Sequence, residues 1–176
     1  DGYTRFTNQL KVAGVEQSDL GRTQENLFGI AQKYGVQLES IGTLYGRATQ
    51  AGKALGASQS DILRFTNGVG AALKVQGGSA EASAGALLQL SQLLGTGTVR
   101  AEEFNSVNEG ARPILQAVAN GISKYAGSVS ALRNDVIEGK VTSQAFFEGF
   151  LRGSAQLESQ AAKANLTIGA SFTILN

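Results

Sequence analysis

The sequence contains no cysteine and no histidine. Without cysteine the chain can form neither a disulfide framework nor a thiolate zinc site, and without histidine it lacks the commonest metal ligand and general base. A run of about 18 apolar residues, the length that indicates a transmembrane helix, is also missing. These absences exclude much enzyme chemistry. We predict a protein that is not an enzyme and that needs no cofactor.

The chain also lacks an excess of charge of either sign. Its formal net charge is +1, and 16% of its residues are charged. Such a balance provides neither a basic field for nucleic acid nor an acidic field for cationic partners. We therefore expect no specific nucleic-acid partner.

The length and the two ends of the sequence indicate one domain of a longer protein. A chain of 176 residues fits a single domain with a core of its own. The start, DGYTRFTNQLKV, has no methionine and lacks the basic and apolar regions of a signal peptide. The end, ASFTILN, stops without a helix-ending signal. We expect a single helical domain over residues 1–176 that is a fragment of a longer chain.

Apolar residues recur at intervals of three and four along almost the whole chain, whereas the period-two alternation of strands is nearly absent. This pattern predicts an all-α fold, a compact domain of about seven to nine helices. Glycines, capping serines (Ser18, Ser58, Ser79 and Ser128) and the single proline, Pro113, mark the boundaries. The expected helices lie near residues 3–12, 18–34, 38–55, 58–76, 79–94, 101–112, 114–122, 128–138 and 143–164, with Asn165 ending the last and another helix starting after it.

The helix expected near residues 79–94 differs from the others in how its leucines are spread. They cover too wide an arc for one stripe, which is typical of a helix that is buried on several sides. We expect the core to be built around this helix.

Two segments share a spacing of glycine, valine and phenylalanine. The first, GTVRAEEF, supplies Gly97, Val99, Glu103 and Phe104, and the second, GKVTSQAF, supplies Gly139, Val141 and Phe146. Each segment follows one expected helix and precedes another. The two units read as a local internal repeat, and as helix-loop-helix units that resemble EF-hands.

The residue types at the ligand positions argue against calcium in either loop. A calcium loop needs oxygen ligands at its first, third, fifth and twelfth places. These places hold Gln92, Leu94, Thr96 and Glu103 in the first loop and Asn134, Val136, Glu138 and Ala145 in the second. One carboxylate in the first loop cannot hold the ion, and the second loop has no carboxylate at its end. We predict no metal site.

The glycine and the valine of each loop predict a structural role instead. Glycine permits a sharp turn with positive φ, valine adds one extended residue, and the next residues cap a new helix. Our hypothesis is that Val99 and Val141 lie side by side in a short bridge. The alternative is two unrelated helical hairpins, and the sequence leaves both open.

The spacing G-x-x-x-G occurs twice, at Gly42 with Gly46 and at Gly149 with Gly153. In membranes this spacing lets two helix backbones approach closely. Neither pair lies in an apolar span of about twenty residues. The pattern therefore favours close helix crossings inside a soluble bundle over a membrane dimerisation face.

Three carboxylates, Glu102, Glu103 and Glu109, lie on or near one expected helix. One interpretation is that two of them act as a general acid and a general base in catalysis. Because histidine, cysteine and a phosphate-binding loop are all missing, a solvated helix face is the better account.

Four segments together resemble a known family. They are TRFTNQLKVAGV, ESIGTLYGRATQAGKALG, ALKVQGGSAEASAGALLQLSQLLGTGTVRAEEFNSVNEGARPIL and EGKVTSQAFF. They are similar, in the right order and over nearly all of the sequence, to the tape measure domain of tailed-phage tail tape measure proteins. The most specific part covers residues 72–113, so the first loop belongs to this signature and not to a metal site.

The resemblance implies a structural protein of the tail of a phage or prophage, whose chain length sets tail length during assembly and which leaves through the tube at DNA ejection. It implies tail tube, tail tip and tail assembly chaperone proteins as partners, and a homo-oligomer within the tail. It places the protein in the virion tail, and in the host cytoplasm during assembly, and leaves room for membrane contact by the full-length protein. The alternatives are a peptidoglycan-degrading module and a membrane-perturbing module.

Overall fold

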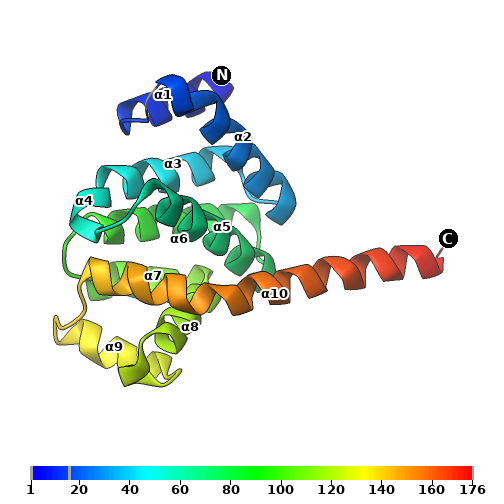
Figure 1. The fold of residues 1–176 in the computed structure, drawn as a ribbon. Coiled ribbons are helices and arrows are strands. Elements are labelled where there is room, and N and C mark those ends of the chain that lie inside the picture. Colours follow the sequence, from blue (N-terminus) through cyan, green and yellow to red (C-terminus); the bar gives the residue numbers. More distant parts are fainter. Residues whose placement is uncertain (1, 16, 176) are drawn as a thin grey trace.

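The structure is a computed structural model that describes the backbone of residues 2–15 and 17–175 and the side chains of residues 4–15 and 18–164. Within these residues the chain forms ten α-helices and one 3-10 turn, so the predicted all-α fold is confirmed (Figure 1). The elements are α1 (Gly2–Val12), α2 (Gln17–Tyr34), α3 (Leu38–Gln50), α4 (Gly52–Leu55), α5 (Gln59–Gln76), α6 (Ala80–Leu94), α7 (Ala101–Gly110), α8 (Arg112–Gly121), the 3-10 turn (Ser123–Tyr125), α9 (Val129–Ile137) and α10 (Ser143–Leu175).

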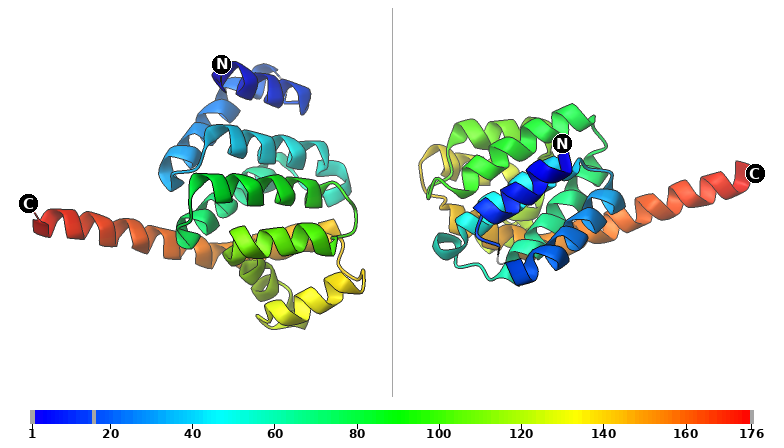
Figure 2. Two further views of the ribbon diagram at one scale, coloured as in Figure 1. Left: turned by 180° about the vertical axis from the view of Figure 1, so that it is seen from behind. Right: turned by 90° about the horizontal axis from the view of Figure 1, so that it is seen from above.

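The helices stack in layers, with α1 at one end and α8 and α9 at the other (Figure 1). The long helix α10 packs mainly on α8 and α5. Its second half projects beyond the rest of the stack, as the views from behind and from above also show (Figure 2). The last buried side chain described on α10 is that of Ala161. Helix α10 therefore contributes to the core from its first turns as far as Ala161.

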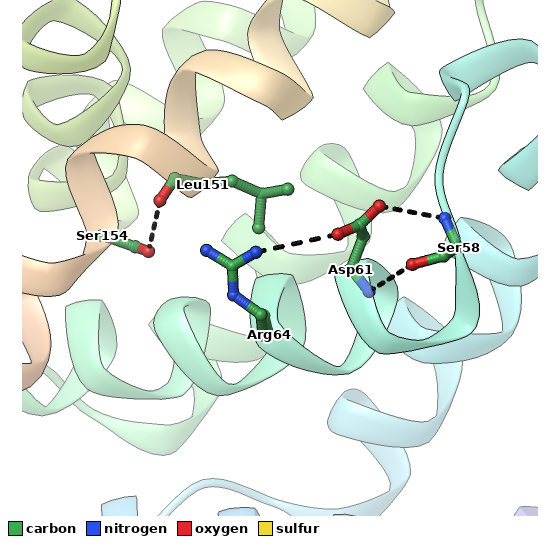
Figure 3. A network of polar contacts seen from close by, with 5 residues as sticks. All are labelled: Ser58, Asp61, Arg64, Leu151 and Ser154. Carbon is green, nitrogen blue, oxygen red and sulfur yellow. Dashed lines mark hydrogen bonds and ion pairs between the residues drawn. The ribbon is translucent and has the colours of Figure 1, made fainter.

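Serine caps begin three of the helices. At α5 the Asp61 N–H donates to Ser58 Oγ at 3.1 Å, and the Ser58 N–H donates to Asp61 Oδ2 at 3.0 Å, which completes a capping box (Figure 3). Ser79 and Ser128 each accept a hydrogen bond from the N–H three residues ahead. These bonds satisfy N–H groups that the first turn of a helix leaves free. The predicted caps at these serines are confirmed, and Pro113 lies in the first turn of α8 as expected.

Three of the expected boundaries are wrong. Helix α2 begins at Gln17, so Ser18 lies inside its first turn. The stretch 38–55 is two helices that meet at Ala51, and the apolar pattern hid the break because both helices bury residues in the same core. Helix α10 continues through position 165 to Leu175. An asparagine inside a helix costs less than about 1 kcal/mol, which is too little to end one.

One cluster of buried apolar side chains runs from α1 to α10. Near its middle the ring of Phe65 stacks on that of Phe147, with centroids 4.7 Å apart, and meets the ring of Phe150 edge to face at 5.1 Å. These contacts join α5 to α10. The expectation for α6 holds in part, because Leu87, Leu90, Leu93 and Leu94 are buried but Leu88 is 50% exposed. The most extensive packing is that of α10 on α8 and on α5, so the core is not built around α6 alone.

Helices α8 and α10 cross with their backbones in direct contact. A Cβ atom on Gly121 would overlap the carbonyl oxygen of Gly149, and one on Gly153 would overlap the carbonyl oxygen of Ala117. Only glycine fits at these points, because a backbone atom cannot move aside as a flexible side chain can. The predicted bundle crossing at Gly149 and Gly153 is confirmed.

The second glycine pair holds α3 close to α1. A Cβ atom on Gly42 would lie 2.6 Å from a ring carbon of Phe6, and one on Gly46 would lie 3.4 Å from the Cβ of Ala13. The predicted crossing inside the bundle is confirmed here too. In the part of the chain that the structure describes, no helix is long and apolar enough to span a membrane.

Candidate functional site

The repeated motif forms two loops, each between two helices. The first covers residues 95–100 and joins α6 to α7, and the second covers residues 138–142 and joins α9 to α10. We call them the paired loops. Gly97 has a φ of +80° and Gly139 a φ of +72°. An added Cβ at either position would meet nothing within 4 Å, so these glycines serve the backbone conformation and not a close contact.

The paired loops join through their main chains. The N–H of Val99 donates to the carbonyl oxygen of Val141 at 2.9 Å. Thr98 and Thr142, the neighbours of these valines, form an isolated antiparallel bridge. The structure thus brings Val99 and Val141 together, with the two threonines as the bridge pair.

Ser143, the first residue of α10, ties the second loop to the first. Its N–H donates to the carbonyl oxygen of Gly97 at 2.9 Å, and its Oγ donates to the carbonyl oxygen of Leu93 at 2.7 Å. Leu93 lies in the last turn of α6, where carbonyl groups lack a partner within the helix. The same oxygen accepts a bond from Thr96 Oγ1 at 3.0 Å. The end of α6 is therefore the point to which both loops are attached.

The apolar residues of the motif anchor the paired loops in the core. Val99, Val141, Phe104 and Phe146 are 1%, 2%, 0% and 0% exposed. Each valine precedes a helix whose first turns carry the phenylalanine, so each loop is fixed at the point where the next helix begins. This arrangement fixes the position of α7 and α10 relative to each other. We call this contact between the paired loops, with the hydrogen bonds of Ser143, the joint.

The structure does not gather metal ligands at the paired loops. Leu94 and Val136, at the third ligand place of each loop, are 2% and 3% exposed and belong to the core. Glu138 forms an ion pair of 2.7 Å with Lys140. Among the described residues, no group of three or more histidine, cysteine, aspartate or glutamate side chains is placed to hold a metal ion.

Glu103 does not lie on a solvated helix face, which corrects the expectation for the three glutamates. Glu102 and Glu109 are exposed, whereas Glu103 is only 6% exposed. Glu103 precedes the buried Val107 by one helical turn, so the two lie on the same face of α7. Its Oε2 atom is buried without a hydrogen-bond partner.

Glu103 also lines a groove of about 940 Å³ beside the first loop. Arg47 and Gln50 of α3, Arg100 of the loop and Gln144 of α10 line the same groove. Sequence reasoning missed this groove, because α3 lies far from the loop in the chain and carries no part of the repeated motif. The only local signal was the glutamate in the first turn of α7.

A second polar cluster joins the 3-10 turn to α9. The hydroxyl of Tyr125 donates to Asp135 Oδ2 at 2.9 Å, and Lys124 Nζ lies 2.7 Å from the same oxygen. Burial, together with the hydrogen bond and the charge of Asp135, raises the pKa of Tyr125 to about 12. Hydrogen bonds from Lys124 and then from Tyr125 lower the pKa of Asp135. The cluster holds the turn against α9.

Comparison with known proteins identifies the family of the chain. A family model described as "Tape measure protein" matches residues 1–176, and so includes both of the paired loops. No curated protein and no solved structure matches the chain.

Proposed function

Because the chain belongs to the tape measure protein family, a family of structural proteins of phage tails, we propose that it is a module that helps to set tail length during assembly and leaves through the tail tube at DNA ejection. The observation that carries this proposal is the family match over all 176 residues. The paired loops support it, because their hydrogen bonds and buried valines serve to fix helices relative to one another.

Release through a narrow tube requires the packed helices to unfold. Two features of the chain favour unfolding at modest cost. The chain has no cysteine, so no disulfide closes a loop. Within the described residues, each ion pair includes an exposed side chain, and such pairs stabilise a fold by little. We expect a reversible melting point in the range of about 45–65 °C. A melting point above about 80 °C would argue against threading, since mesophilic domains melt well below it.

Tail length is the measurement that tests the proposal. As one continuous helix, 176 residues at about 1.5 Å each would span about 260 Å. Removing the segment in frame from its phage gene should shorten the tails seen by electron microscopy by up to about this length. An in-frame duplication is the matched control and should lengthen them. Tails of unchanged length in both variants would contradict the proposal.

The family places the protein among other phage tail proteins. Within the tail, we propose contacts with the tail tube, the tail tip and the tail assembly chaperone proteins, and association of several copies of the chain. We also propose that the chain is present in the host cytoplasm while tails assemble. Co-purification from infected cells, with the tail genes deleted one at a time, tests each of these partners.

The family is structural, and two measurements address the alternative functions. A fall in the turbidity of a cell-wall suspension would favour a peptidoglycan-degrading module. Leakage of dye from liposomes would favour a membrane-perturbing module. We expect neither signal above that of buffer.

A further inference from the structure

The groove beside the first of the paired loops has the size of a binding site. Its volume of about 940 Å³ lies within the range of about 300–1,000 Å³ that is typical of ligand pockets. Residues from α3, α4, α6, α7, the first loop and the start of α10 line it. Glutamines from three of these elements, Gln50, Gln92 and Gln144, supply donors and acceptors around it. These groups can form hydrogen bonds with a polar ligand in the groove.

Glu103 gives the groove an acidic group without a protein partner in the described part of the chain. The residue is 6% exposed, its Oε2 atom has no hydrogen-bond partner, and among the described residues it makes no ion pair. Buried carboxylates in proteins are normally paired, because leaving one unpaired has a high desolvation cost. Glu103 therefore brings to the lining of the groove a carboxylate that has no partner among the described residues.

Two arginines supply the opposite charge. Arg47 and Arg100 line the same groove, are both exposed, and make no ion pair within the part of the chain that the structure describes. A guanidinium group binds a carboxylate through two parallel hydrogen bonds. The groove thus combines one enclosed acidic group with two accessible basic groups.

Helix capping does not explain the position of Glu103. A glutamate at the third position of a helix usually accepts a hydrogen bond from the N–H of the N-cap residue. The N-cap of α7 is Arg100, and no such bond to Glu103 is formed. The neighbouring Glu102 lies in the same first turn but is exposed. Both glutamates interact with the positive end of the helix dipole, so Glu102 is a matched control for that effect.

We propose that this groove binds an extended peptide segment of a partner protein in which a lysine or arginine is flanked by acidic residues. The basic side chain pairs with Glu103, and the flanking carboxylates pair with Arg47 and Arg100. The site goes beyond the proposed role in the tail and does not depend on it, because it rests on the charges and the shape of the groove alone.

The test uses the 176-residue chain and acetylated, amidated peptides. The probe is Gly-Asp-Lys-Asp-Gly, the control is Gly-Asp-Leu-Asp-Gly, and binding is followed by the chemical shifts of the backbone amides. We expect saturable shifts centred on residues 95–103 with the lysine peptide. Binding should be about tenfold weaker or more with the leucine peptide and in Glu103→Gln, because a hydrogen bond between charged groups is lost. Glu102→Gln should bind as the natural chain does.

Several outcomes would overturn the proposal. The leucine peptide could bind equally well, Glu103→Gln could keep the affinity, or no peptide could give saturable shifts. Displacement of the peptide by a single-stranded oligonucleotide at equal concentration would instead assign Arg47 and Arg100 to phosphate. Thermal unfolding of each variant separates loss of binding from loss of the fold, since Glu103→Gln should melt no lower than Glu102→Gln. None of these measurements involves tail length, so failure here leaves the proposed function standing, and the reverse also holds.

Discussion

The N–H of Val99 donates to the carbonyl oxygen of Val141 at 2.9 Å, although helices α7, α8 and α9 separate the two residues in the chain. This bond and the neighbouring bridge between Thr98 and Thr142 hold together the two ends of the segment that contains these three helices. The positions of α7, α8 and α9 therefore all depend on the contact between the paired loops. Substitutions in the paired loops should therefore lower the free energy of unfolding by more than the loss of their local contacts alone.

Ser143→Ala tests the joint at the paired loops. Its hydroxyl donates to Leu93 from a position that is 2% exposed, so the substitution should lower the free energy of unfolding by about 1 kcal/mol. Urea denaturation followed by circular dichroism measures the change. Ser154→Ala is the matched control, because its hydroxyl bonds Leu151 within the same helix (Figure 3). An equal loss in both variants would contradict the role given to Ser143.

Gly153→Ala tests the backbone contact between α8 and α10. The added Cβ would overlap the carbonyl oxygen of Ala117, and overpacking against backbone should lower the free energy of unfolding by about 3 kcal/mol or more. Gly85→Ala in α6 is the control, since its Cβ would meet nothing within 4 Å. That change should raise stability by up to about 1 kcal/mol through helix propensity. Equal effects in the two variants would show that the helices do not cross at Gly153.

Asp61 makes stability depend on pH. Hydrogen bonds from the backbone and then the side chain of Ser58 lower the pKa of Asp61 below its ordinary value of 3.8. A carboxyl group with a depressed folded pKa stabilises the fold above its unfolded pKa and loses that effect as the pH falls through the folded pKa. The melting temperature should therefore exceed that of Asp61→Asn near neutral pH, and the difference should shrink well below pH 3.8. A difference that grows toward acid pH would have the wrong sign.

Tyr125 should affect stability at the alkaline end. Its pKa is raised from 10.0 to about 12, first by burial and then by the hydrogen bond and charge of Asp135. A raised folded pKa means that its stabilising effect is complete below pH 10.0 and is lost as the pH rises toward about 12. Asp135→Asn should shift the tyrosinate absorbance titration to lower pH. Because the chain has four tyrosines, Tyr125→Phe is needed to identify the component that moves.

Local sequence signals predicted much of the fold because their causes are local. The capping box at Ser58 and Asp61 depends on residues three apart, and the turn at Gly97 depends on what a single residue permits. The repeated spacing of the two loops was also visible in the chain. Each of these features would be recognisable in an isolated segment.

The features that sequence reasoning missed depend on tertiary contacts. The break at Ala51 lies inside an unbroken apolar pattern, since α3 and α4 bury their residues in one core. The burial of Glu103 depends on the packing of α7, and the groove beside it depends on Arg47 from a distant helix. Neither residue stands in a pattern that sets it apart from a surface charge. Only the packed arrangement of helices distinguishes them.

The direct backbone contact between α8 and α10 also determines how the molecule would respond to a mechanical force. A pull on the projecting end of α10 acts directly on α8, because the Ala117 carbonyl sits against Gly153 and the Gly149 carbonyl against Gly121. Sliding either helix along the other would bring a larger side chain to a place that admits only hydrogen, so gradual slip is blocked. We expect the two helices to separate in one cooperative step. The hydrogen bonds of Ser143 to the first loop and to α6 would then be the next contacts under tension.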